Sequence, residues 1–82
     1  MIKLLKYDGD WIISTIEEIE DVEYGEPDCV LKYPCFIANL DLSYYPNFSA
    51  DREIIVRSSN ITVMTEPNLR LLNTYKAFIE NE

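Results

Sequence analysis

Over residues 2–65, short apolar segments rich in β-branched residues alternate with polar turn signals, and this alternation constrains the fold more than any other feature. Five segments have the length and residue types of strands, namely 2–7, 11–22, 29–40, 52–57 and 61–65. The stretches between them carry Gly9, Gly25 and Pro46, which favour turns and interrupt strand pairing. The sequence therefore predicts five strands joined by turns and loops.

The segment 11–22 is compatible with two structures. Four isoleucines fall at helical spacing, and Ser14 with Glu17 resembles a helix capping box. The β-branched residues and the alternation that follow a hairpin turn favour a strand instead. We interpret the segment as one long strand with a bulge or sharp bend near Glu17–Glu18, and a helix is the alternative.

The segment 29–40 is a second long strand, and Pro34 interrupts it. Proline cannot donate a hydrogen bond to a neighbouring strand, so its presence predicts an edge position or a bend. Residues 41–51 contain Pro46 and polar residues, and we expect them to form a loop.

The end of the chain has a helical period. Pro67 suits the first turn of a helix, with Thr65 or Glu66 as its cap. An apolar stripe at helical spacing follows, formed by Leu69, Leu72, Tyr75, Phe78 and Ile79. We predict a C-terminal helix over residues 67–80. Together with the strands, this predicts a mostly β single domain over residues 1–82, built as a small five-stranded, strongly bent antiparallel barrel with a C-terminal helix.

The charge balance limits the possible partners. The 82 residues include 7 Lys+Arg against 15 Asp+Glu, a net charge of −8, so the chain as a whole repels nucleic acid and anionic membranes. A polyanion must therefore bind at a local basic patch, and we expect no membrane partner. The N-terminal MIKLL has no long apolar run and no cleavage signature. A chain this small often gains stability by oligomerising.

Catalytic and metal chemistry are not expected. The chain has no histidine, so Ser58 and Ser59 lack a histidine base, and a zinc site is close to excluded. Cys29 and Cys35 on one extended strand would be roughly 20 Å apart, far beyond the separation of about 7 Å that a disulfide allows. We interpret them as free thiols in a reducing compartment, which indicates the cytoplasm. The protein is therefore not expected to be an enzyme or to need a cofactor.

Two clusters have both a binding and a structural interpretation. The carboxylates between Glu17 and Asp28 could hold Mg²⁺ or Ca²⁺, but their spacing fits no calcium loop, and a solvated strand end and turn explains them better. The aromatic residues of the loop 44–48 could stack on bases, cap the core or fill a subunit interface. The structural interpretations are favoured for both clusters.

The hairpin EIIVRSSNITVM, residues 53–64, places Arg57 and Asn60 on either side of two serines. In isolation it is a solvated polar turn. It also resembles the second motif of the Sm-like superfamily (Sm, LSm and bacterial Hfq proteins), in which an apolar pair precedes Arg-Gly, two variable residues and a last apolar strand. Arg57 aligns with the motif arginine and Ile61 with the start of the last strand, while Ser58 replaces the glycine.

The resemblance to Sm-like proteins covers the strand order over residues 2–65. Asp28 occupies the place of the aspartate that precedes the third strand in the first Sm motif, and Lys32 stands where the family has an asparagine. The whole chain resembles the short acidic Sm-like proteins encoded by marine phages, which implies the host cytoplasm as its location.

The resemblance implies a cyclic homo-oligomer of about five to eight subunits in which the fourth strand of one subunit pairs with the fifth strand of the next. The expected subunit interface contains Ile54, Ile55, Val56, Ile61 and Val63. The turn between these strands would line a central pore, so that single-stranded nucleic acid, with RNA the expected ligand, would contact Arg57, Ser58, Asn60 and Lys32. The alternative function is an oligomeric adaptor that uses its acidic surface and C-terminal helix for protein contacts.

Overall fold

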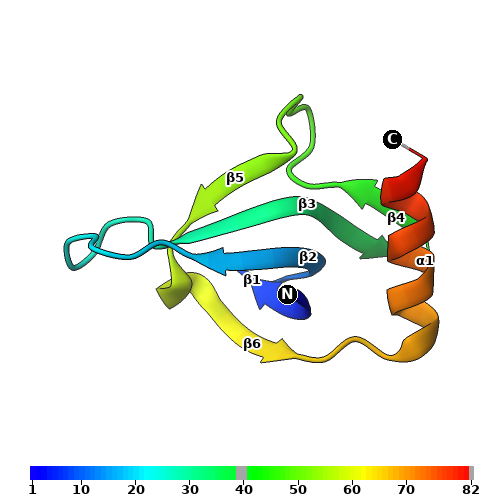
Figure 1. Ribbon diagram of the computed structural model, residues 1–82, viewed down its shortest axis with the longest axis horizontal. Coiled ribbons are helices and arrows are strands. Elements are labelled where there is room, and N and C mark those ends of the chain that lie inside the picture. The colour runs from blue at the N-terminus through cyan, green and yellow to red at the C-terminus, as the bar shows by residue number, and fades with distance from the viewer. Residues whose placement is uncertain (39–40, 82) are drawn as a thin grey trace.

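The computed structural model of the protein describes residues 1–38 and 41–81, so the last two positions of the predicted strand 29–40 lie outside the described residues. The elements in chain order are β1 (Ile2–Tyr7), β2 (Asp10–Glu18), β3 (Cys29–Ala38), β4 (Asp41–Tyr44), β5 (Glu53–Val56), the 3-10 turn η1 (Ser58–Asn60), β6 (Ile61–Thr65) and α1 (Leu69–Glu80). Figure 1 shows α1 at one end of the sheet and the loop 19–28 projecting from the other end.

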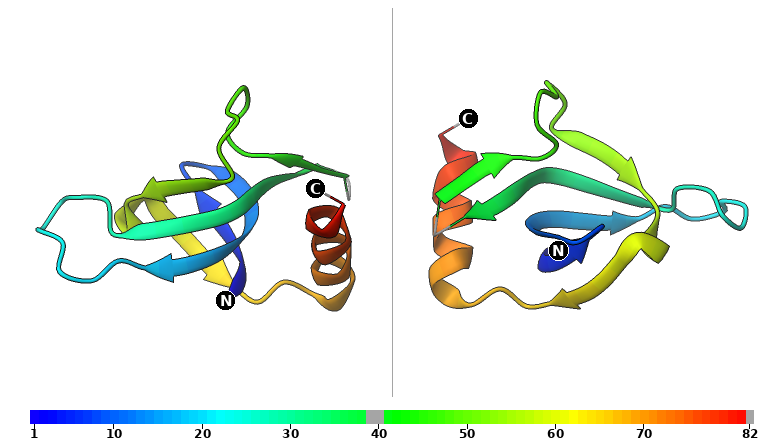
Figure 2. Two further views of the ribbon diagram at one scale, coloured as in Figure 1. Left: turned by 45° about the horizontal axis from the view of Figure 1, so that its top comes forward. Right: turned by 180° about the vertical axis from the view of Figure 1, so that it is seen from behind.

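The strands form one antiparallel sheet in the order β4–β3–β2–β1–β6, with β5 also paired to β3. On β3, residues 29–32 pair with β5 and residues 35–38 pair with β4, so β5 and β4 follow one another along the same edge. The predicted mostly β antiparallel fold with a C-terminal helix is confirmed. Over residues 1–38 and 41–81, the sheet has six strands rather than the predicted five, and it does not close into the predicted barrel. It stays open because β5 and β6 diverge from η1 (Figure 2), and no pairing joins them within the described residues.

The bend predicted at Pro34 is confirmed. Tyr33 has φ 52°, and the break between the β5 and β4 pairings falls at Tyr33 and Pro34. Strand pairing continues across the bend through the Tyr33 N–H, which donates to the Arg52 carbonyl at 2.6 Å.

The segment 11–22 forms a strand rather than the alternative helix, but the prediction of a bulge near Glu17–Glu18 is wrong. The strand ends at Glu18, and its irregularity lies between Ile13 and Thr15. The intervening Ser14 is fully buried, and its hydroxyl donates to the Lys32 carbonyl at 3.1 Å. The irregularity of β2 therefore lies at a buried serine that hydrogen-bonds to β3, and not at the acidic end of the strand, where it was predicted.

The predicted loop 41–51 is wrong at its start, because residues 41–44 form β4. The register of β4 on β3 sets Leu42 opposite Ile37 and Tyr44 opposite Cys35. This alternation directs two half-buried apolar side chains toward α1, which stabilises a strand too short to stand out in the sequence.

The C-terminal helix is confirmed, but its cap and apolar stripe differ from the prediction. Asn68 is the N-cap, and its side chain accepts a hydrogen bond from the Leu71 N–H at 2.8 Å. Leu69 is 72% exposed, whereas Leu71 and Tyr75 are buried. The buried stripe therefore follows the positions of Leu71, Tyr75, Phe78 and Ile79, and the predicted phase was displaced at its first residues.

Two apolar clusters lie on opposite faces of the sheet. The inner core contains Leu5, Ile12, Cys29, Leu31 and Val56, and half-buried residues of β5 and β6 pack against it, so the sheet curls around this side. The helix-side core contains Ile13, Cys35, Leu71 and Tyr75. The two cysteines are free and buried, and they belong to different clusters, because Cys29 precedes the bend of β3 and Cys35 follows it.

Candidate nucleic-acid interface

The turn that carries Arg57 connects β5, on one edge of the sheet, to β6, on the opposite edge. Arg57 is the N-cap of η1 in an extended conformation, and its carbonyl accepts from the Asn60 N–H at 3.1 Å. At the far end of the turn, the Asn60 carbonyl accepts from the Asp8 N–H at 3.2 Å. Asp8 belongs to the turn between β1 and β2 that Gly9 predicts, so this hydrogen bond anchors η1 to the β1–β2 connection.

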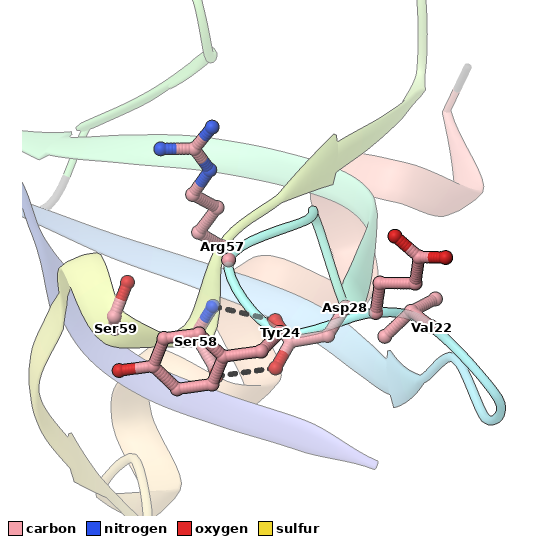
Figure 3. A pocket seen from close by; sticks show the side chains of 8 residues that line it. Val22, Tyr24, Asp28, Arg57, Ser58 and Ser59 are labelled. Carbon is pink, nitrogen blue, oxygen red and sulfur yellow. Dashed lines mark hydrogen bonds between the residues drawn. The ribbon is translucent and has the colours of Figure 1, made fainter.

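Asp28 anchors the other end of η1. Its Oδ1 accepts from the Ser58 N–H at 2.7 Å, and its Oδ2 accepts from the Ser58 hydroxyl at 2.6 Å (Figure 3). The Asp28 N–H in turn donates to the Val56 carbonyl at 3.1 Å. Hydrogen bonds from the Ser58 side chain and then from its backbone lower the pKa of the Asp28 carboxyl below its usual value of 3.8.

A surface pocket of about 310 Å³ lies between the acidic loop and η1. It is lined by Val22, Glu23, Tyr24, Gly25, Asp28, Arg57, Ser58 and Ser59. Tyr24 is fully exposed. The lining thus includes an aromatic ring and a guanidinium, which are groups that stack on and pair with a base or phosphate.

Arg57 is free to take an anionic partner. Its side chain is exposed, and no ion pair involves it within residues 1–38 and 41–81. Figure 3 shows the Arg57 guanidinium directed away from the Ser58–Asp28 hydrogen bonds, so the nearby carboxylate is used by the turn and not by the arginine.

Lys32 lies in a different environment from Arg57. Its Nζ is 3.2 Å from Glu17 Oε1 and 3.8 Å from Glu53 Oε1, across the strand pairs on either side. The hydrogen bond to Glu17 raises the pKa of Lys32. Lys32 lines a second pocket together with Arg52 and neighbouring residues, and none of the residues of the Arg57 pocket contributes to it.

The four predicted nucleic-acid contacts thus divide into groups. Arg57 and Ser58 line one pocket, and Asn60 lies at the other end of η1 beside the hairpin 8–10. Lys32 is separate from them and is paired with carboxylates. Sequence reasoning missed Tyr24, although an aromatic residue in a polar turn with no strand face to pack on is a usable signal.

The five predicted interface residues have two kinds of environment. Ile54, Val56 and Ile61 pack into the inner core of their own chain. Ile55 and Val63 are 62% and 40% exposed. The apolar side chains that remain for a partner are therefore Ile55 on β5 and Val63 on β6, together with Met64, which is 48% exposed.

The remaining candidates from the sequence have structural surroundings. Tyr45 packs edge-on against Phe36 and Tyr7 beside the inner core, whereas Phe48 is fully exposed. Within the described part of the chain, no group of three or more Cys, Asp or Glu side chains is arranged to hold a metal ion. Over the same residues, no helix is long and apolar enough to cross a membrane.

The chain matches a protein family described as "Family of unknown function (DUF6561)" over residues 1–80, and it belongs to that family. No curated protein matches the chain.

Proposed function

We propose that this member of the DUF6561 family is a ring-forming Sm-like protein of the cytoplasm that binds single-stranded nucleic acid, with RNA the expected ligand, through Arg57 and the turn around it. The observation that carries the proposal is the position of this turn. It joins β5, on the β3 edge of the sheet, to β6, on the opposite edge. It also presents a cation that has no carboxylate partner among the described residues.

The strand arrangement supports self-assembly. β1, β2 and β3 form a meander, β5 pairs with β3 and β6 pairs with β1. The strands that correspond to the fourth and fifth of the Sm-like order therefore lie on opposite edges of the sheet, and β5 shares its edge with β4. Within the described residues, each of them has one unpaired edge. An unpaired edge favours strand addition, and pairing β5 of one copy with β6 of the next repeats head to tail until a ring closes.

The exposed apolar residues favour the same pairing. Ile55 on β5 and Val63 on β6 are exposed on the strands that would form the seam. Placing them against each other in the assembled ring would remove apolar area from water, which is a favourable contribution of about 25 cal/mol per Å².

A ring would also explain how an acidic chain holds a polyanion. Each subunit contributes one Arg57, and a ring brings these cations together around one axis while the net charge of −8 is spread over the outer surface. A weak single contact is then multiplied by effective concentration. Tyr24 in the same pocket adds a stacking surface for a base.

Two measurements test the proposal in sequence. Native mass spectrometry is expected to show one closed oligomer, and a clean monomer at micromolar protein would contradict the ring. Fluorescence anisotropy with short labelled single-stranded RNA at low salt is expected to show binding that Arg57→Ala removes. The matched control is Arg70→Ala, which deletes an exposed arginine from α1. Equal loss of binding in both variants would mean that only bulk charge matters.

A second candidate function, an adaptor for proteins, is favoured by the loop 19–28. The loop projects from the sheet (Figure 1) and exposes Val22 and Tyr24 among carboxylates. The apolar stripe of α1 is buried against the sheet, so the exposed side of the helix is mostly polar, with Leu69 as an exposed apolar residue at its start. A closed ring that fails to bind RNA would favour the adaptor function.

A further inference from the structure

A strip of side chains on the helix-facing side of the sheet has no role in the proposed pore. Trp11 on β2, Lys6 on β1 and Val63 on β6 occupy directly opposed positions in the register. Opposed residues of paired strands point to the same face, so these three side chains form a row across three strands. Trp11 is 43% exposed, because the helix-side core covers this face only around other residues. Val63 is 40% exposed and is the residue of the row that the proposed seam would cover. We call this row the Trp11 strip.

The cation in the Trp11 strip is held by the indole and not by a carboxylate. The Lys6 Nζ lies 5.7 Å from the centroid of the Trp11 ring. In the part of the chain that the structure describes, Lys3 and Lys32 form ion pairs, and none involves Lys6. Asp10 precedes Trp11 on the strand and therefore points to the opposite face. The strip thus combines an exposed aromatic ring with a positive charge that is not neutralised.

The Trp11 strip lies beside the far end of the turn that carries Arg57. Tyr7 pairs with Ile61 at the start of β6, and the Asp8 N–H donates to the Asn60 carbonyl. The Lys6–Val63 pair of the strip therefore follows the strand pair that adjoins Asn60, whereas Arg57 lies at the opposite end of η1. One extended strand that leaves the Arg57 pocket along η1 would reach the strip next.

We propose that the Trp11 strip is a second contact site for the same single-stranded nucleic acid, with a base stacked on Trp11 and the adjacent phosphate held by Lys6. This inference rests on the proposed function, since it needs a strand bound at the turn. A cation beside an exposed aromatic ring fits the alternation of phosphate and base in a single strand. An apolar peptide segment would instead offer no anionic partner to Lys6.

Trp11 is the single tryptophan of the chain, so its emission reports on the strip alone. The experiment titrates the full-length protein with short mixed-sequence single-stranded RNA and follows tryptophan fluorescence and the anisotropy of labelled RNA in parallel. We expect saturable quenching with the same midpoint as the anisotropy. A strand of abasic sugar–phosphate units of the same length is expected to leave the emission unchanged, because it offers no ring to stack.

Substitutions separate the two parts of the site. Trp11→Ala is expected to raise Kd at least about fivefold, the lower end of what base–aromatic stacking contributes, while Trp11→Phe keeps most of the affinity. Lys6→Gln removes one phosphate contact and is expected to reduce the slope of log K against log salt by about 0.7. Lys76→Gln on α1, a charge-matched change away from the strip, should leave both unchanged.

The outcomes distinguish this inference from the proposed function. If anisotropy shows binding that depends on Arg57 while the Trp11 emission stays constant and Trp11→Ala binds normally, the strip is off the path of the strand and only the further inference is overturned. If no RNA binds, both fail. If the emission responds to protein concentration and not to RNA, a second copy of the chain covers the strip, and the second contact site is again excluded.

Discussion

Tyr75 is the residue whose removal should most clearly test how the helix is attached to the sheet. Its ring is fully buried in the helix-side core. Its hydroxyl donates to the carbonyl of Tyr33 at 2.9 Å and lies 3.1 Å from that of Lys32. The hydroxyl thus ties α1 to the bend of β3, at the point where pairing changes from β5 to β4. Burial raises the pKa of Tyr75, so the hydroxyl is protonated and able to donate at neutral pH.

The cost of Tyr75→Phe follows from these contacts. One hydroxyl proton serves one acceptor at a time, so a single hydrogen bond worth about 1 kcal/mol is lost. After the substitution, the Lys32 carbonyl still accepts from the Ser14 hydroxyl at 3.1 Å, whereas the side-chain donor that remains at the Tyr33 carbonyl is the weaker Cys35 thiol at 3.5 Å. Leaving the Tyr33 carbonyl with a weaker donor adds to this loss, and we expect Tyr75→Phe to lower the free energy of unfolding by about 1–2 kcal/mol in total.

Chemical denaturation followed by circular dichroism measures this loss at one fixed protein concentration, because assembly would change the apparent stability. For a domain of this size, 1–2 kcal/mol is a substantial part of a free energy of unfolding of about 4–12 kcal/mol. It corresponds to a decrease in Tm of roughly 4–16 °C. Tyr24→Phe makes the same chemical change at a fully exposed position and should cost under about 0.5 kcal/mol. Equal stability of the two variants would refute the role of the hydroxyl.

Three further predictions concern the turn, the paired lysine and the seam. Hydrogen bonds from Ser58 lower the pKa of Asp28, so the contribution of this carboxylate to folding stability is present above pH 3.8 and is lost as the pH falls below it. Asp28→Asn should therefore flatten the acid limb of a pH–stability curve. An unchanged limb would contradict the anchoring role. Lys32→Gln breaks two solvent-screened ion pairs and should change the unfolding free energy little, without weakening RNA binding in anisotropy. A large loss of affinity would instead restore Lys32 to the site. Ile55→Asp places a charge on the exposed edge strand and should convert the oligomer to smaller species in native mass spectrometry. The control Leu69→Asp, at a similarly exposed position on α1, should leave the oligomer intact.

The strands could be predicted because their signals are local. Alternating apolar residues and β-branched side chains identify a strand without knowledge of its partners, and Gly9 or Pro34 marks the turn or bend by its own backbone chemistry. β4 was missed because four residues carry too little alternation to be distinguished from a loop. The phase of the α1 stripe was displaced because Leu69 precedes the first buried position, and the true start depends on the Asn68 cap.

The site was only partly predictable because its contacts join distant parts of the sequence. Arg57 was identified by its place in a motif, and the structure leaves its side chain exposed. The carboxylate that positions the turn is 30 residues away from Ser58, and no local pattern links Asp28 to that serine. Lys32 looked available because its partners come from two other strands, and only the register brings Glu17 and Glu53 to it.

The serine at position 58 gives the turn a property that a glycine there would not have. Glycine supplies only a backbone N–H, whereas Ser58 adds a hydroxyl, so both oxygens of Asp28 are occupied within the protein. A carboxylate with both oxygens occupied has less capacity to accept hydrogen bonds from a base. If RNA binds here, recognition at this pocket should therefore rest on the guanidinium of Arg57 and the ring of Tyr24, which favour a phosphate and a stacked base of any identity. Ser58→Gly would release one Asp28 oxygen, and a gain of base preference in that variant, measured by competition between homopolymers, is the expected consequence.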